Sequence, residues 1–126
     1  MSGVPDDVAR LIASHIDSVE KLEILLLLRG ERDRVWTSDQ VSRELRRNPS
    51  SVSRCLKQLR ERGLLSGSTR DGFTFQPSEP ALEQQVDRLA ETYATRRVSV
   101  IQLIVANPMD SVTTFADAFR LRKRKD

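Results

Sequence analysis

The sequence predicts a mainly α-helical protein with one small β-hairpin, and three observations support this prediction. Apolar residues recur at helical spacing along most of the 126 residues. Asn48-Pro49 separates two amphipathic stretches, because proline lacks the backbone N–H that a continuous helix needs. Asp71-Gly72 lies between two strand-prone runs, which is typical of a hairpin turn. We expect one part over residues 1–77 and a second, C-terminal part over residues 78–126.

Two helices are expected at the start of the first part. Residues 5–15 begin with proline and two acids, followed by apolar residues at helical spacing. Residues 19–30 are apolar on most sides, which indicates a helix at the centre of the domain. Asp17 and Glu20 stand three residues apart and predict a capping box at its start, while Gly30 is a plausible end.

A short strand, two helices and the hairpin are expected next. Residues 34–36, RVW, are strand-prone, and two good N-cap residues follow them before a helix over 38–47. Asn48 is expected to cap the following helix, 49–62, which has proline in its first turn. Residues 66–75 then form the hairpin.

The second part is expected to hold one long helix from Ser78 to Asn107, a short helix after Asp110 and a basic tail. Unbroken, the long helix would measure roughly 45 Å. Its apolar residues follow heptad spacing and form what we call the apolar seam: Leu82, Val86, Leu89, Tyr93, Val100 and Leu103. An isolated amphipathic helix is barely stable, so the apolar seam needs a partner. We expect a homodimer through the seam, and the alternative is a brace against residues 5–15. Arg96 occupies one position of the seam. Either it fixes the register of the two helices in a dimer, or it marks a point where the packing of the helix changes.

The charges are distributed unevenly along the chain. Residues 37–77 carry eight Lys or Arg against four Asp or Glu, and residues 120–126 carry five against one. The remaining segments are mildly acidic. Two basic blocks indicate a polyanionic partner, with solvated helix surface as the alternative. The tail either adds phosphate attraction or merely keeps the end soluble.

The segment TSDQVSRELRRNPSSVSRCLKQLRERGLL, followed by GSTRDGFTF, resembles the winged helix-turn-helix DNA-binding domain of MarR-like and related bacterial transcription regulators. The resemblance covers about residues 18–77. It implies a winged helix-turn-helix fold and a function in transcription regulation, with double-stranded DNA as the partner.

Helical geometry assigns separate roles to the residues around helix 49–62. Three aliphatic residues, Val52, Leu56 and Leu59, anchor one face, so the opposite face points outward. The residues predicted to read bases in the major groove are Ser50, Ser51, Ser53, Arg54 and Gln58. Those predicted to contact phosphates are Arg43, Arg46, Arg47, Lys57, Arg60 and Arg70. Free N–H groups at the helix start are expected to favour a phosphate. The alternative is a winged-helix adaptor that binds a protein and no DNA.

Other function classes lack their signatures in this sequence. It has no Gly-rich phosphate loop, HExxH or GxSxG motif, and His15 and Cys55 are its only histidine and cysteine. We therefore expect no enzyme activity, no cofactor and no bound metal. The single cysteine and the lack of a long apolar run or secretory signal predict a cytoplasmic protein. Trp36 and Tyr93 are candidates for lining the pocket of an unknown effector, although core packing is favoured for Trp36. A buried, inert role is favoured for Cys55 over a redox switch.

Overall fold

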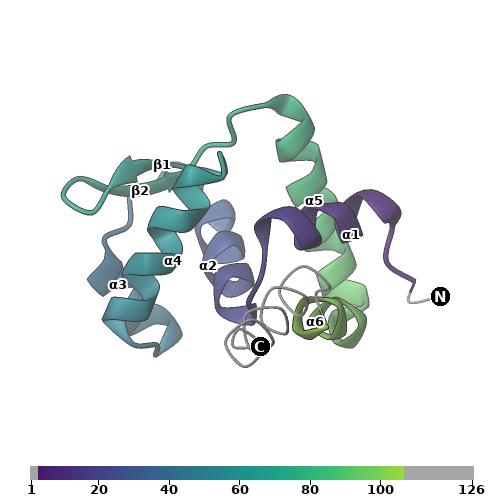
Figure 1. The fold of residues 1–126 in the computed structure, drawn as a ribbon. Helices are drawn as coiled ribbons and strands as arrows, with labels where there is room; N and C mark the ends of the chain where they lie inside the picture. Colours follow the sequence, from purple (N-terminus) through teal and green to yellow (C-terminus); the bar gives the residue numbers. More distant parts are fainter. Residues whose placement is uncertain (1–2, 107–126) are drawn as a thin grey trace, which may run out of the picture.

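Six helices and one hairpin follow one another along residues 3–106, the part that the computed structural model describes (Figure 1). The helices are α1 (Asp6–His15), α2 (Val19–Gly30), α3 (Ser38–Leu45), α4 (Pro49–Glu61), α5 (Pro80–Thr95) and α6 (Arg97–Val105). The strands are β1 (Leu65–Ser68) and β2 (Gly72–Phe75). The predicted class, mainly α with a small antiparallel hairpin, is confirmed. The terminal helix expected after Asp110 and the basic tail lie outside the described residues.

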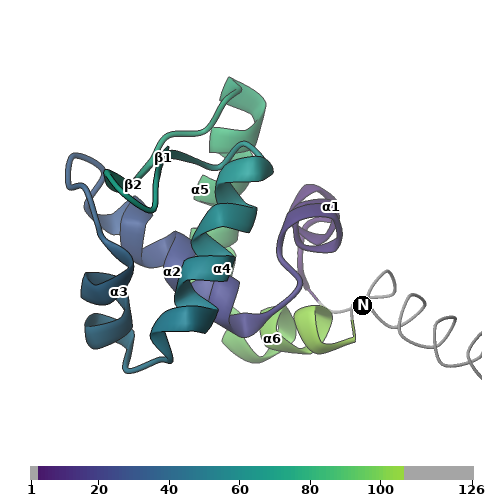
Figure 2. The same ribbon diagram turned by 60° about the vertical axis from the view of Figure 1, so that its left-hand side comes forward.

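The central helix is α2, as its apolar sequence predicts. Leu22, Leu25 and Leu28 are fully buried, and α2 packs against α3, α4, β2 and α6. Figure 1 shows α3, α4 and the hairpin on one side of α2, with α1 and α6 on the other. In Figure 2, α4 passes in front of α2, and α1 and α6 lie on the side away from α3. A single hydrophobic core cluster includes residues from both predicted parts of the chain.

The start of α2 differs from the predicted capping box. Ser18 is the N-cap, and its hydroxyl accepts a hydrogen bond from the backbone N–H of Lys21 at 3.1 Å. Asp17 instead pairs with the Lys21 ammonium at 2.7 Å. The Glu20 carboxylate accepts a hydrogen bond from the Ser51 hydroxyl of α4. Tertiary contact has therefore replaced the local contact that the Asp17–Glu20 spacing predicts.

The caps of α3 and α4 follow the predicted sequence signals. Thr37 and Gln40 form a capping box at the start of α3. Asn48 caps α4 and Pro49 occupies its first position, as predicted. Because Pro49 cannot continue the preceding helix, the break between α3 and α4 is fixed by sequence.

The hairpin pairs β1 with β2 from Leu65 opposite Phe75 to Ser68 opposite Gly72. The strand predicted over 34–36 is present only as a bridge between Trp36 and Phe73, whose two backbone hydrogen bonds measure 2.8 and 2.7 Å. Gly72 has a φ of +91°, and a Cβ there would lie 2.5 Å from a Val35 methyl carbon. A side chain at this position would therefore clash with the segment that the bridge brings close.

The long helix predicted over residues 78–107 is two helices, and this part of the prediction is wrong. The chain leaves helical geometry at Arg96, where φ is −134° and ψ is 52°. The hydroxyls of Thr92 and Thr95 bond to backbone carbonyls one turn earlier, a pattern that bends helices. The break lets α6 fold back onto α1 and α2, burying Val100 and Ile104.

The apolar seam is covered within its own chain, which is the brace alternative. Val86, Leu89 and Val100 are fully buried, and Leu82, Tyr93 and Leu103 pack partly buried against the same core. Helix α5 packs on α1, where Arg88 pairs with Asp7 at 3.0 Å. Three residues assigned to a dimer interface are thus core residues of one protomer, because α1 already occupies the face that a second copy would need.

Candidate nucleic-acid interface

Helix α4 has one buried face and one exposed face. Val52, Cys55, Leu56 and Leu59 are buried against α2, α3 and β1. On the opposite side Ser50, Arg54, Lys57 and Glu61 are exposed and follow the helix at intervals of three or four residues. Lys57, predicted to contact a phosphate, therefore lies in the middle of the outward face.

Ser51 does not point outward, in contrast to its predicted role in reading bases. Its hydroxyl donates a hydrogen bond to Glu20 Oε1 of α2 at 2.6 Å. The position of Ser51 on the helix turns it about 100° from Ser50, toward α2. Gln58 lies on the same flank as Ser51 and is half-buried. Neither side chain belongs to the exposed strip of α4.

The opposite flank of α4 faces the hairpin. Arg60 donates a hydrogen bond from Nη1 to the carbonyl oxygen of Gly67 in β1, at 3.2 Å. Ser53 lies two turns before Arg60 on this flank and is half-buried. Arg60 thus ties α4 to the hairpin, and its guanidinium is already partly committed to that contact.

The first turn of α4 has no free backbone N–H group, contrary to expectation. Pro49 has none, and the N–H groups of Ser50 and Ser51 donate to Asn48 Oδ1 at 2.8 and 3.3 Å. The Val52 N–H donates to the Asn48 carbonyl. A phosphate near this turn would depend on side chains, because Asn48 has satisfied the helix start.

The turn between α3 and α4 carries two arginines in different environments. Arg46 ends α3 in the left-handed conformation, with φ of 55°, and its side chain is exposed. Arg47 donates from Nε and Nη2 to Glu23 Oε1 of α2, at 3.1 and 2.7 Å. The hydrogen bond that Arg47 donates to Glu23, together with the charge of that carboxylate, raises the pKa of Arg47. Arg46 is available to a ligand, whereas Arg47 is held by an acid.

Five cations on this side of the molecule have no side-chain hydrogen bond or ion pair with any described residue. We call them the interface cations: Arg43, Arg46, Arg54, Lys57 and Arg70. They come from α3, the turn after it, α4 and the tip of the hairpin. Exposed acids accompany them, namely Asp39, Glu44, Glu61 and Asp71. The Asp71 carboxylate and backbone N–H bond to the Ser68 hydroxyl, so this acid also shapes the hairpin turn.

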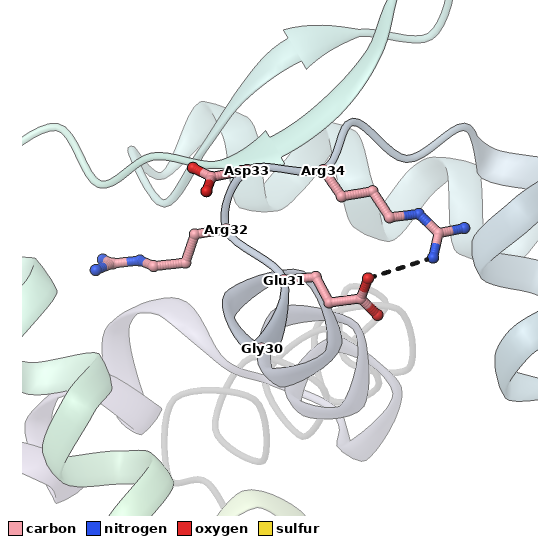
Figure 3. Close-up of a pocket in the computed structure, with 5 residues that line it drawn as sticks. All are labelled: Gly30, Glu31, Arg32, Asp33 and Arg34. Carbon is pink, nitrogen blue, oxygen red and sulfur yellow. Dashed lines mark hydrogen bonds and ion pairs between the residues drawn. The ribbon is translucent and has the colours of Figure 1, made fainter.

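The candidate effector residues occupy ordinary packing positions. Trp36 is 1% exposed in the core, and the Arg34 guanidinium lies 3.6 Å from its ring centroid. Tyr93 is half-buried beneath Arg97. A shallow depression beside Trp36 is lined by the five consecutive residues Gly30 to Arg34, and Figure 3 shows Arg32 and Arg34 pointing away from each other. Arg34 and Glu31 pair with each other at 3.5 Å, so they do not leave a set of free polar groups aimed at a small ligand.

Cys55 and His15 do not add reactive groups to the site. Burial, and to a smaller extent the negative charge of the nearby Glu20, raises the pKa of the Cys55 thiol to about 11. The thiol is therefore protonated near neutral pH, where its nucleophilicity is low. Burial and the neighbouring Arg62 lower the pKa of His15, at the far end of α1.

Two carboxylates at the start of α2 belong to the candidate site, although the sequence pattern predicts only a helix-capping role for Glu20 and no role for Glu23. Glu20 contacts Ser51 and Glu23 contacts Arg47, so both acids face the start of α4. The second oxygen of Glu20, Oε2, is buried and has no hydrogen-bond partner among the described residues. The available signal is two acids three residues apart in a largely apolar helix.

Comparisons with protein-family models, curated proteins and solved structures found no match for this chain. Within residues 3–106, no group of three or more His, Cys, Asp or Glu side chains is arranged to hold a metal ion. The helices of the same part of the chain are all too short or too polar to cross a membrane.

Proposed function

We propose that the protein is a DNA-binding transcriptional regulator that reads the major groove with α4. The order α2, α3, α4 and hairpin is compatible with a winged helix-turn-helix, in which the hairpin is the wing. The observation that carries the proposal is the set of interface cations, all exposed and unpaired on the side formed by α3, α4 and the hairpin. Long cationic side chains without internal partners are available to neutralise phosphates.

The dimensions and residue types of α4 fit this role. A major groove about 12 Å wide admits a helix of 10–12 Å diameter. The small Ser50 side chain lets the first turn of α4 approach the base edges closely. Arg54 is in reach of a guanine edge in that arrangement, and Lys57 follows one turn later on the same face. Arg43, Arg46 and Arg70 would then contact the flanking phosphates.

The proposal includes a homodimer, since two-fold symmetry would present two reading helices about 34 Å apart on a palindromic site. The apolar seam is not available for this contact. The described apolar residues that remain most exposed on the C-terminal helices are Val98, at 67%, and Val105, at 69%, both on α6. A dimer would therefore use a surface other than the one the heptad spacing predicts.

A protein-binding adaptor is the second candidate function. The observations that favour it are the exposed Glu61 and Asp71, which would repel phosphate, and the exposed valines of α6. An adaptor would not need unpaired cations on three successive elements, so we give DNA binding precedence.

The test is binding to a random-sequence duplex at increasing salt, followed by selection of a preferred site. A regulator should bind at low salt and lose affinity as a steep power of the salt concentration. Arg43→Ala and Arg46→Ala, made separately, should each flatten this dependence. Arg10→Ala, which removes an exposed cation from α1, is the matched control and should leave the dependence unchanged. If the parent protein binds no duplex at low salt, the DNA-binding proposal is wrong and the adaptor function is the one that remains.

A further inference from the structure

Arg47 is held in place by both its backbone and its side chain. Its N–H donates to the carbonyl of Ser42 at 3.0 Å, and its carbonyl accepts a hydrogen bond from the buried Ser42 hydroxyl. The residue therefore has a defined position between α3 and α4. From that position its side chain reaches α2, where two N–H groups meet one oxygen of Glu23.

Among the cations of residues 37–77, all of which the structure describes, Arg47 is alone in forming an ion pair. The interface cations around it are unpaired. The pair is also partly open to solvent, with 40% of the Arg47 side chain and 31% of the Glu23 side chain exposed. Exposed ion pairs of this kind add little to stability, so a stabilising role does not account for the Glu23–Arg47 pair.

The pair lies where a phosphate would otherwise be expected. The turn that holds Arg47 directly precedes α4, between exposed Arg46 and the capped first turn. Glu20 adds a second carboxylate close by, and both Glu20 and Glu23 interact electrostatically with Arg47. A phosphate that approaches Arg47 must displace the Glu23 carboxylate from the guanidinium. The negative charge of Glu20 would also repel that phosphate.

We infer that Glu23 withholds Arg47 from DNA phosphate, so that the Glu23–Arg47 pair lowers the affinity of the protein for non-specific duplex. Glu23 acts here as a positioning residue that sets how many phosphates the protein neutralises. The inference rests on the proposed function. It identifies a specificity device, because weaker non-specific binding leaves more protein free for a preferred site.

The experiment compares Glu23→Gln with Glu83→Gln as a matched control. Glu83 of α5 pairs with Arg32 at 2.7 Å, the same length as the Glu23–Arg47 contact, and the substitution changes net charge equally. The Arg32 guanidinium also lies 4.8 Å from the Phe75 ring centroid, a second contact that does not involve Glu83. Affinity for a random duplex is measured by fluorescence anisotropy between about 50 and 200 mM salt, and melting temperatures verify folding.

Glu23→Gln should bind more tightly than the parent, and its log–log salt slope should be steeper by about 0.9, the value for one added phosphate contact. The ratio of the Glu23→Gln affinity to the parent affinity should accordingly be about three- to fourfold larger at 50 mM than at 200 mM salt. Arg47→Gln alone should keep the parent slope, and adding it to Glu23→Gln should restore that slope. Glu83→Gln should also keep it.

A folded Glu23→Gln variant whose slope equals that of the parent or of Glu83→Gln would overturn the inference while leaving DNA binding intact. A flatter slope for Arg47→Gln alone would overturn it as well, because Arg47 would then contact phosphate in the parent. If the parent binds no duplex at any salt concentration, the proposed function and the inference both fail.

Discussion

Arg54 is the residue whose surroundings bear most directly on base recognition. It lies on the outward face of α4, and its side chain forms no hydrogen bond or ion pair with any described residue. The residues beneath it, Cys55 and Leu56, are buried and fix the helix to the core. Its guanidinium is therefore presented by a rigid element without an internal competitor, unlike that of Arg47.

Arg54→Ala should weaken binding to a selected site by about 1–3 kcal/mol and relax base preference at one position. Binding to random duplex should change much less. Parallel anisotropy titrations with the two duplexes measure this difference. Equal losses on both duplexes would show that Arg54 contacts backbone rather than bases.

Arg46 combines local backbone strain with an exposed charge. A non-glycine residue in the left-handed region is unfavourable, and Arg46 has a φ of 55°. Arg46→Gly should therefore raise the free energy of unfolding by up to about 1 kcal/mol, while weakening duplex binding through the lost cation. Arg46→Ala is the control that keeps the strain, so it should weaken binding without stabilising. Urea denaturation and duplex titration together separate the two effects, and equal stability of both variants would argue against strain.

The junction between α3 and α4 shows, at the level of elements, what local sequence can specify. Proline after asparagine breaks one helix and starts the next, and the burial of Val52, Leu56 and Leu59 follows from their spacing. The same spacing wrongly predicts that Ser51 points outward, because a position about 100° from the centre of the exposed face can turn either way without knowledge of where α2 lies. Similarly, the Glu23–Arg47 contact joins residues 24 positions apart, and no local spacing encodes it.

Local sequence spacing also does not predict the break at Arg96. The heptad spacing continues through Arg96 from α5 into α6, and nothing in the spacing distinguishes a straight helix from a folded one. The burial of Val100 and Ile104 against α1 and α2 requires the chain to turn back, and this packing determines that the segment forms two helices. Tertiary packing thus determined the part of the fold that periodicity left open.

Asn48 provides a test of the α3–α4 junction as an element. Asn48→Ala removes the acceptor for the first N–H groups of α4 and should cost about 0.5–2 kcal/mol of stability. Asn48→Asp keeps that acceptor, so its stability should match the parent, whereas its added negative charge should weaken duplex binding. Thermal melts and duplex titrations measure both. A fully stable Asn48→Ala protein would contradict the capping geometry.

The whole molecule is stabilised by a core that joins the N-terminal and C-terminal helices. Leu89 of α5 is fully buried within one chain, and ion pairs link α5 to α1 and to the end of α2. Asp87 of α5 pairs with Arg29 of α2 in the same chain at 2.9 Å. The C-terminal helices therefore complete the fold of a single protomer.

Leu89→Ala should lower the free energy of unfolding by about 2–5 kcal/mol, as for other buried leucines. Because the lost contacts lie within one chain, the loss should be the same at every protein concentration. Denaturation at two concentrations at least twentyfold apart tests this. A loss that shrinks as the concentration rises would assign Leu89 to an interface between subunits, where mass action restores stability.

The most direct test of the proposed function is NMR chemical-shift mapping of the isotope-labelled protein with a selected duplex. DNA binding through the outward face of α4 predicts the largest changes at Ser50, Arg54 and Lys57, smaller ones at Arg43, Arg46 and Arg70, and none over α1. Changes centred on α6, or no changes while the duplex is in excess at low salt, would contradict it.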